Sequence, residues 1–195
     1  MKQRGINIID WLISKNLGGK LKKGVDIPSW LIGKNSGGGE TETDFTGNQA
    51  PTVWNVSGNS ATGENEYGTW TIECDQTPAN GNISNVFDGD STTNAGWAAR
   101  VTVNIILSLP SGVSIKPSME HLAGTGNVST YFAGYNEATG EWEQLKTGFP
   151  GSTYFAITTD NYFTKFKLNT SGMTTRKGAV INELAVTEGT IKVQK

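Results

Sequence analysis

The sequence predicts an all-β sandwich that follows an extended N-terminal arm. Short apolar runs recur along residues 62–195, and several of them alternate apolar with polar side chains, as in residues 163–168. Alternation with a period of two places one face of a strand in a core. The spaces between the runs are rich in Asn, Thr, Ser and the 25 glycines, which is typical of many turns that join many strands.

Strands are predicted at 69–74, 101–109, 128–135, 142–145, 154–158, 163–168 and 180–186, each bounded by turn residues. Residues 136–141 are a plausible hairpin loop between two of these strands. About seven short strands without intervening helices indicate a sandwich or a barrel. We therefore assign residues 62–195 to one β-sandwich.

Composition limits the partners of this chain. Its 195 residues suit one domain with an appendage, and the net charge of -2 does not favour nucleic acid as a partner. Cys74 is the single cysteine, so no internal disulfide is expected. We expect no signal peptide and no membrane insertion, because the N-terminal apolar stretch lacks a cleavage site and no run approaches about 20 apolar residues. Synthesis in a cytoplasm follows from this prediction.

Residues 1–36 contain an internal repeat, because the segment 11–19 returns as 30–38 with a Trp-Leu-Ile cluster, a Lys-Asn pair and terminal glycines. Neither copy is long enough to bury its own apolar side chains, so we predict an arm that docks on virion proteins or on sister subunits. Two alternatives stay open: the arm packs on its own sandwich, or it forms an amphipathic helix on a membrane surface. The docking residues would be Trp11, Leu12, Ile13, Trp30, Leu31 and Ile32.

Residues 37–61 are predicted to be a linker and lead-in rich in Gly, Asn and Thr. The stretch 37–44 is acidic and glycine-rich, which is typical of a flexible hinge. Trp54 is the large apolar anchor that we expect in the lead-in.

A family resemblance rests on four sequence blocks. Residues 85–93, Asn-Val-Phe-Asp-Gly-Asp-Ser-Thr-Thr, followed by Trp97, resemble the Phe-Asp-Gly-Asp signature of discoidin (coagulation factor 5/8 type C) domains. Residues 130–145, 164–169 and 182–186 are similar to later strands of that family, in the expected order. The resemblance implies a galactose-binding-like jelly roll whose end loops bind ligands, commonly glycans, without catalysis. It also implies that Trp70, Trp97 and Trp142 serve the core.

The resemblance further implies a structural calcium ion held by Asp88, Asp90, Thr93 and Glu183. Calcium takes six to eight oxygen ligands, which carboxylates, a hydroxyl and loop carbonyls can supply. Asp88 has an alternative role, because its side chain can cap its own turn while Gly89 takes a positive φ.

Sugar recognition uses an aromatic face for the ring and planar polar groups for the hydroxyls. The candidates in predicted loops are Tyr67, His121, Asn127, Tyr154 and Tyr162. His121 has the alternative of being a structural histidine in a segment, 117–124, that lacks clear strand alternation.

No catalytic motif is present, so we predict a binding protein and not an enzyme. The leading hypothesis is a bacteriophage virion protein, either a capsid decoration, a head fibre or a tail component, which would be oligomeric and face outward to adhere to glycans. The alternative is a carbohydrate-binding module associated with a secreted glycoside hydrolase. A third hypothesis is a structural protein that makes protein contacts only.

Overall fold

Two antiparallel β-sheets pack face to face in the computed structural model, which describes residues 39–98, 101–125, 129–147, 153–171 and 179–194. Residues 41–193 form one compact unit. This arrangement confirms the predicted all-β sandwich. The docking residues of the predicted arm lie outside the described residues.

The first sheet has the strand order β11-β8-β13-β6-β5, and β1 also pairs with β13. Its strands are β1 (Glu40–Thr46), β5 (Asn80–Gly81), β6 (Ala95–Gly96), β8 (Val113–Thr125), β11 (Thr153–Ala156) and β13 (Val180–Gln194). A short 3-10 helix, η1 (Ile83–Val86), precedes β6. No helix in the described part of the chain has the length and apolar character needed to span a membrane.

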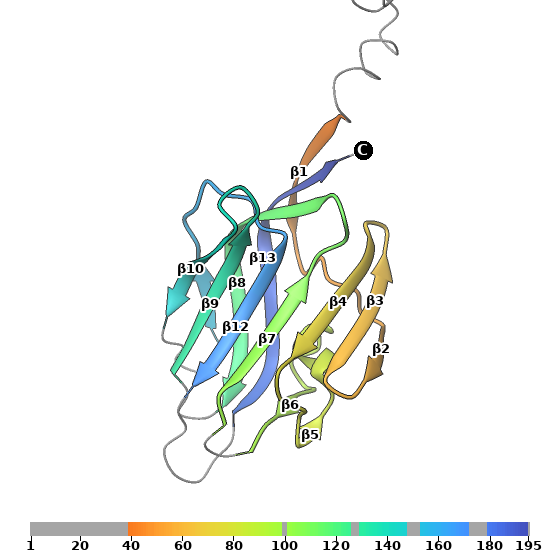
Figure 1. Cartoon of the computed structure of the whole chain (residues 1–195), viewed down its shortest axis with the longest axis vertical. Helices are drawn as coiled ribbons and strands as arrows, with labels where there is room; N and C mark the ends of the chain where they lie inside the picture. Colours follow the sequence, from red (N-terminus) through yellow and green to blue (C-terminus); the bar gives the residue numbers. More distant parts are fainter. Residues whose placement is uncertain (1–38, 99–100, 126–128, 148–152, 172–178, 195) are drawn as a thin grey trace, which may run out of the picture. The chain divides into compact units, whose positions relative to one another are not determined.

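The second sheet has the order β10-β9-β12-β7-β4-β3-β2. Figure 1 looks onto this sheet, with strands of the first sheet behind it. Its strands are β2 (Trp54–Ser57), β3 (Ser60–Asn65), β4 (Gly68–Cys74), β7 (Val103–Ser108), β9 (Ser129–Asn136), β10 (Glu141–Thr147) and β12 (Lys165–Ser171). Neighbouring strands along both paths run antiparallel.

The core lies between the sheets and follows the predicted alternation. In β7, Val103, Ile105 and Leu107 are buried, whereas the residues between them are partly exposed. The largest side chains that are almost completely buried are those of Trp70, Phe87, Phe132 and Phe163. Burial of each large apolar side chain contributes roughly 1.5 to 3 kcal/mol, so the core accounts for much of the stability of a chain without disulfides.

The structure adds six strands that the alternation does not reveal, namely β1, β2, β3, β5, β6 and β8. β1, β2 and β3 include much of the predicted lead-in, so the compact unit begins at Thr41 and not near residue 62. β8 includes the segment 117–124, where Pro117 cannot donate to the ladder and β13 carries irregularities opposite Pro117 and Met119. These irregularities interrupt the alternation of buried and exposed side chains, so a strict period of two does not predict this strand.

Trp142 differs from the expectation for the core tryptophans. Trp70 and Trp97 are buried, as the resemblance implies. Trp142 is only half-buried, because it lies opposite Tyr135 on the outer face of β10 and β9.

Gly134 in β9 shows how closely the core is packed. A Cβ atom at this position would overlap the ring of the fully buried Phe163. Glycine in a strand commonly marks such a close approach. Phe163 in turn packs edge-on against Phe166, with ring centroids 6.0 Å apart.

We expect Gly134→Ala to lower the free energy of unfolding by about 1 to 3 kcal/mol, because the added methyl group forces the Phe163 ring or the strand to shift. Gly96→Ala is the matched control, since Gly96 is also a buried strand glycine but its added Cβ would lie 3.6 Å from the nearest atom. Urea unfolding measures both variants. Wild-type stability of Gly134→Ala would contradict this packing.

Candidate functional site

The loop after η1 is built around the carboxylate of Asp88. Its Oδ1 accepts a hydrogen bond from the backbone N–H of Asp90 at 2.9 Å, and its Oδ2 accepts from the Thr93 hydroxyl at 2.8 Å. Gly89 between the two acids has a φ of 78°, a conformation that favours glycine. Asp88 therefore stabilises its own turn, in the manner that the sequence offered as an alternative to metal binding.

Glu183 of β13 reaches the same loop with a buried carboxylate. The residue is 3% exposed, and no hydrogen bond of normal geometry reaches either carboxylate oxygen. Burial and the negative charges of Asp88 and Asp90 together raise the pKa of Glu183 to about 7, against the lowering effect of the nearby backbone N–H of Gly89. Carboxylates that share a low-dielectric site repel one another, so this cluster favours a proton or a cation.

The side chain of Asn182 joins β13 to the loop. Its amide donates to the backbone carbonyls of Ser91 at 3.2 Å and Thr93 at 3.0 Å. The structure thus places Asp88, Asp90 and Thr93 of the predicted calcium site in one loop, and Glu183 on the strand β13 that Asn182 joins to that loop. The donors are all oxygen, which fits calcium chemistry. Within the described ranges, however, no group of three or more His, Cys, Asp or Glu side chains is arranged to hold a metal ion.

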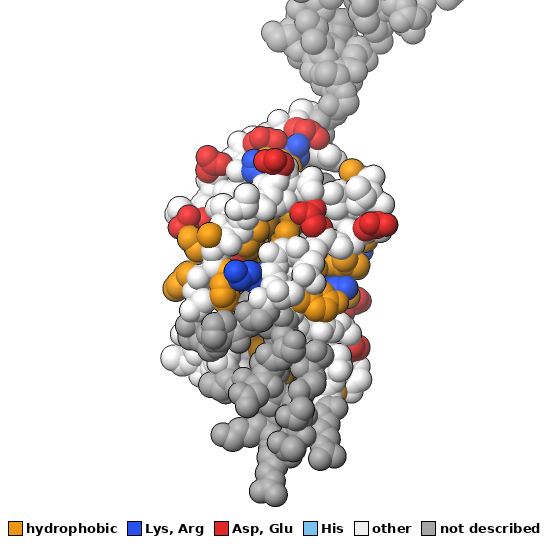
Figure 2. All heavy atoms as spheres, turned by 90° about the vertical axis from the view of Figure 1, so that its left-hand side faces the viewer, with side chains coloured by type: hydrophobic (Ala, Val, Ile, Leu, Met, Phe, Trp, Pro, Cys, Tyr) orange, Lys and Arg blue, Asp and Glu red, His pale blue; other side chains and the backbone are white. Residues whose placement is uncertain are grey.

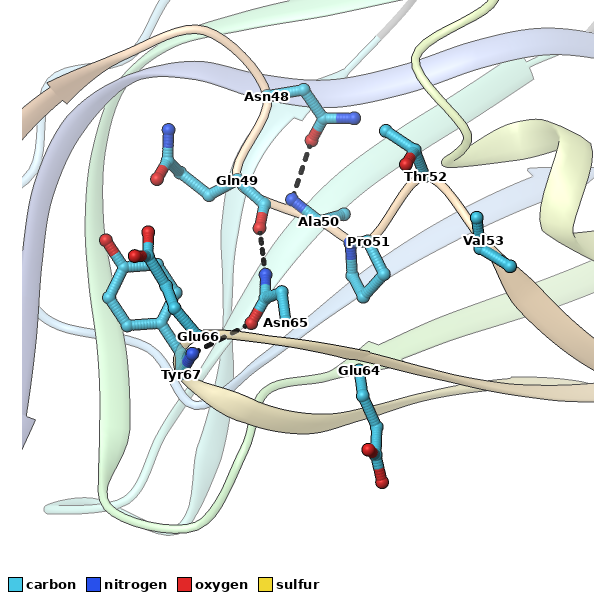
Figure 3. Close-up of a pocket in the computed structure, with 10 residues that line it drawn as sticks. All are labelled: Asn48, Gln49, Ala50, Pro51, Thr52, Val53, Glu64, Asn65, Glu66 and Tyr67. Atoms are coloured by element: carbon cyan, nitrogen blue, oxygen red, sulfur yellow. Dashed lines mark hydrogen bonds between the residues drawn. The ribbon is translucent and has the colours of Figure 1, made fainter.

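An open groove lies beside β2, β3 and β4, near the β2 edge of the second sheet. It has a volume of about 440 Å³ and is lined by residues 48–53, which precede β2, and by residues 64–67 at the β3–β4 turn. Figure 3 shows these two segments facing each other, with Tyr67 and Glu66 at one end and Val53 at the other. Val53 is 79% exposed.

Asn65 fixes the shape of the groove. Its Oδ1 accepts from the backbone N–H of Tyr67 at 3.0 Å and from Trp70 Nε1 at 2.9 Å. Its Nδ2 donates to the backbone carbonyl of Gln49 at 2.8 Å, which ties the two walls together (Figure 3). Because Trp70 is buried in the core, the groove is anchored to the rigid part of the sandwich.

The groove combines an aromatic ring with carboxylates and amides. Burial raises the pKa of Tyr67, and the neighbouring Glu66 carboxylate raises it further. Glu64 and the amide of Gln49 also line the groove, and none of its lining residues is Lys or Arg. The lining is therefore suited to a polar ligand with hydroxyl or amino groups and unsuited to an anion.

His121 and Tyr154 form a second aromatic feature. They lie opposite each other on β8 and β11, and their rings stack with centroids 4.3 Å apart and 18° between the planes. Tyr154 is 65% exposed, which makes this pair a small aromatic platform. Burial lowers the pKa of His121, so the neutral imidazole is favoured.

The five predicted ligand residues do not form one site. Tyr67 lines the groove, whereas His121 pairs with Tyr154. Tyr162 lies under the ammonium groups of Lys116 and Lys192, at 5.5 Å and 4.4 Å from its ring centroid. Asn127 lies outside the described residues, as do the six docking residues of the arm.

Sequence reasoning missed Asn48, Gln49, Glu64 and Glu66, which lie in or beside the lead-in. The available signal was a turn, because residues 65–68, Asn-Glu-Tyr-Gly, begin and end with typical turn residues, and the structure places this turn between β3 and β4. That turn predicts a β3–β4 hairpin but not the segment that faces it, since residues 48–53 approach through tertiary folding.

No protein-family model and no curated protein sequence matches this chain. Solved structures similar to it include a variant of chitosan-binding module 1 from a chitosanase/glucanase of Paenibacillus sp. IK-5, with a TM-score of 0.49 and 18% identity over 74% of this chain and 98% of that one. CpGH89CBM32-6 of Clostridium perfringens has a TM-score of 0.46 and 14% identity over 67% and 95%. The CBM32 of AlyQ, in complex with 4,5-unsaturated mannuronic acid, has a TM-score of 0.46 and 10% identity over 59% and 92%.

These neighbours are carbohydrate-binding modules. At identities of 10% to 18% and TM-scores of 0.46 to 0.49, they assign no ligand to this chain.

Glu120 of β8 is a second buried carboxylate, remote in sequence from the Asp88 loop. It is completely buried between β11 and β13, and neither carboxylate oxygen has a hydrogen-bond partner. Burial raises its pKa well above the usual 4.5, while the positive charge of Lys146 lowers it. The protonated form of Glu120 is therefore the one that the fold accommodates.

We expect the wild type to lose stability as the pH rises above about 4.5. Glu120→Gln should not show this loss. In that range the unfolded chain ionises this carboxyl while the folded chain keeps it protonated, which costs up to about 1.4 kcal/mol for each pH unit until the folded pKa is passed. Urea unfolding of both proteins from pH 4.5 to 8 measures the difference. A constant difference across this range would contradict the raised pKa.

Proposed function

We propose that this chain is a non-catalytic glycan-binding protein and that the groove beside β3 and β4 holds the sugar. The observation that carries the proposal is the lining of the groove, where Tyr67 lies beside Glu66 and near Glu64 in an open volume of about 440 Å³. A sugar ring offers an apolar face to an aromatic side chain and hydroxyls to carboxylates and amides. The anchoring of Asn65 to Trp70 supports a preformed site, which lowers the entropy cost of binding.

The His121–Tyr154 platform is the second candidate site for a sugar. Its stacked rings and the 65% exposure of Tyr154 favour it, because an exposed aromatic side chain in a fixed orientation is a suitable surface for a pyranose ring. It lacks the enclosing second wall that the groove has, so we place the main site in the groove.

The chemistry of the described residues supports binding without catalysis. Cys74 is buried, and burial raises the pKa of its thiol to about 11, which leaves it protonated and a poor nucleophile. His121, the only histidine of the chain, does not line the groove.

We also propose that calcium binds at the Asp88 loop through Asp88, Asp90, Thr93 and Glu183. The ion would supply positive charge to a buried carboxylate that otherwise has no hydrogen-bond partner. It would act as a structural ion, since it would join the loop to β13 and take no part in a reaction.

The larger assembly to which the β-sandwich would belong is proposed from the sequence repeat alone. Residues 1–36 would attach the protein to a larger assembly such as a phage particle. Many weakly binding copies of the sandwich on one particle would raise avidity by roughly 10² to 10⁴. A module that accompanies a secreted glycoside hydrolase is the alternative, and there the arm would not be needed. Absence of the chain from purified particles would contradict the first setting.

Tyr67→Ala should weaken binding of any sugar identified on a glycan array by about tenfold or more, because the stacking face is lost. Tyr67→Phe keeps the ring and its packing, so its loss should be smaller. Isothermal titration with the full-length chain measures both.

Tyr154→Ala is the control, since it removes an aromatic ring at the platform and leaves the groove intact. If this variant loses binding and Tyr67→Ala does not, the platform is the site. A blank array with well-folded protein would refute glycan binding.

Addition of calcium to the metal-depleted chain should raise the melting temperature, because an ion that binds only the folded state stabilises it by about 2.7 kcal/mol at 100 times its Kd. Glu183→Gln should abolish most of this rise. Glu120→Gln, which alters a buried carboxylate elsewhere, should keep it. Differential scanning calorimetry tests the three proteins, and an unchanged wild-type melting temperature would refute the ion site.

A further inference from the structure

The outer face of the second sheet carries a cluster of aromatic and cationic side chains that neither the groove nor the ion site uses. We call it the Lys–aromatic face, and it comprises Tyr131, Tyr135, Trp142, Lys165 and Lys167. These residues come from the adjacent strands β9, β10 and β12. Figure 1 looks onto this face, and no described element lies across it.

Strand register sets the positions of these side chains. Tyr135 lies opposite Trp142 on one side and opposite Lys165 on the other. Lys167 lies opposite Ala133, whose small side chain separates Tyr131 from Tyr135 and leaves room for the lysine between the rings. Because side chains on one face of paired strands are direct neighbours, the cluster has a defined geometry.

The rings hold both ammonium groups. Lys167 Nζ lies 4.4 Å from the Trp142 ring centroid and 5.5 Å from that of Tyr131, and Lys165 Nζ lies 5.2 Å from that of Tyr135. Tyr135 and Trp142 contact each other at 5.3 Å in a tilted arrangement. Such cation–π contacts restrict long lysine side chains that would otherwise move freely in water.

Neither ammonium is neutralised by a carboxylate of the described residues, because no ion pair involves Lys165 or Lys167 there. By contrast, Lys192 forms an ion pair with Glu42 at 3.2 Å. The Lys–aromatic face therefore presents two positive charges, already oriented, whose hydrogen-bonding groups are still available to an external anion.

The edge of the sandwich at β10 borders the Lys–aromatic face. Figure 2, turned so that the β10 side faces the viewer, shows hydrophobic side chains across the middle of the described surface with basic side chains among them. Acidic side chains gather mainly above this band (Figure 2).

We propose that the Lys–aromatic face is a second binding site and that its ligand is an anionic polysaccharide carrying carboxylate or sulfate groups. The ammonium groups would bind the anionic groups, while the edges of Trp142 and the tyrosines would contact the apolar parts of the sugar rings. Charge complementarity selects this occupant over a neutral glycan, which would leave both cations without a partner. The site is independent of the groove, whose carboxylates would repel the same ligand.

The test is binding of the full-length chain to polygalacturonate, to dextran sulfate and to neutral dextran, measured by affinity electrophoresis at low and high salt. The wild type should be retarded by one or both anionic polymers at low salt and not by dextran. The double variant Lys165→Gln with Lys167→Gln should lose about tenfold in affinity, and salt should weaken wild-type binding. The polymer that is bound identifies carboxylate or sulfate as the recognised group.

Lys116→Gln with Lys192→Gln is the matched control, since it removes the same charge from two lysines that also lie over a ring, that of Tyr162. This control should bind as the wild type does, and so should Tyr67→Ala, which separates the face from the groove. Equal losses in the two double variants, full binding by Lys165→Gln with Lys167→Gln, or no retardation of the wild type would overturn the proposal.

Discussion

The register of β12 between β7 and β9 is the constraint on which both the core and the outer face depend. It places Phe166 and Leu168 in the core, and it places Lys165 and Lys167, which alternate with them, on the opposite face. A slip of one residue would expose the two apolar side chains and bury the two lysines. The close contact between Gly134 and Phe163 opposes such a slip, because only a position without a side chain can lie under that ring. The packing that stabilises the sandwich therefore also positions the Lys–aromatic face.

Two buried carboxylates share the cost of burying a negative charge, but the charges around them differ. Glu120 and Glu183 both lie out of water without hydrogen-bond partners, and burial raises the pKa of each. Near Glu120 the influential charge is the positive one of Lys146, which opposes the effect of burial. Among the described residues no negative charge adds to the penalty there, so protonation is sufficient to accommodate this residue in the core. Near Glu183 the charges are those of Asp88 and Asp90, which worsen the penalty. Repulsion that the fold maintains at one place is easier to understand if a cation binds there, since a purely structural role would be served better by an amide.

The sequence predicts the strands that alternate and misses those whose pattern is interrupted. The run 163–168 has strict alternation and overlaps β12 at residues 165–168, whereas β8 contains Pro117 and faces irregular pairing in β13. The residues around Asp88 and Glu183 could be nominated because a family-like motif joins them, although they are about 95 positions apart in the chain. No motif joins residues 48–53 to Tyr67, so the groove emerges only when the chain is folded. Trp142 illustrates the remaining limit, because its position along a strand does not reveal which face of the sheet is covered.

The net charge of the whole chain does not show how positive and negative side chains are distributed over its surface, and this distribution matters for binding. A net charge of -2 argues against a general affinity for polyanions, but the groove and the Lys–aromatic face have opposite local character. They belong to opposite ends of one seven-stranded sheet, with β3 near one edge and β10 at the other. An anionic sugar that fits the lysines is repelled by Glu64 and Glu66, and a sugar that satisfies those carboxylates leaves the lysines without a partner. If both sites bind, they must therefore select different groups, either on two polymers or on distinct parts of one mixed polymer. A rigid sheet that holds two such sites apart would favour surfaces that carry both kinds of group.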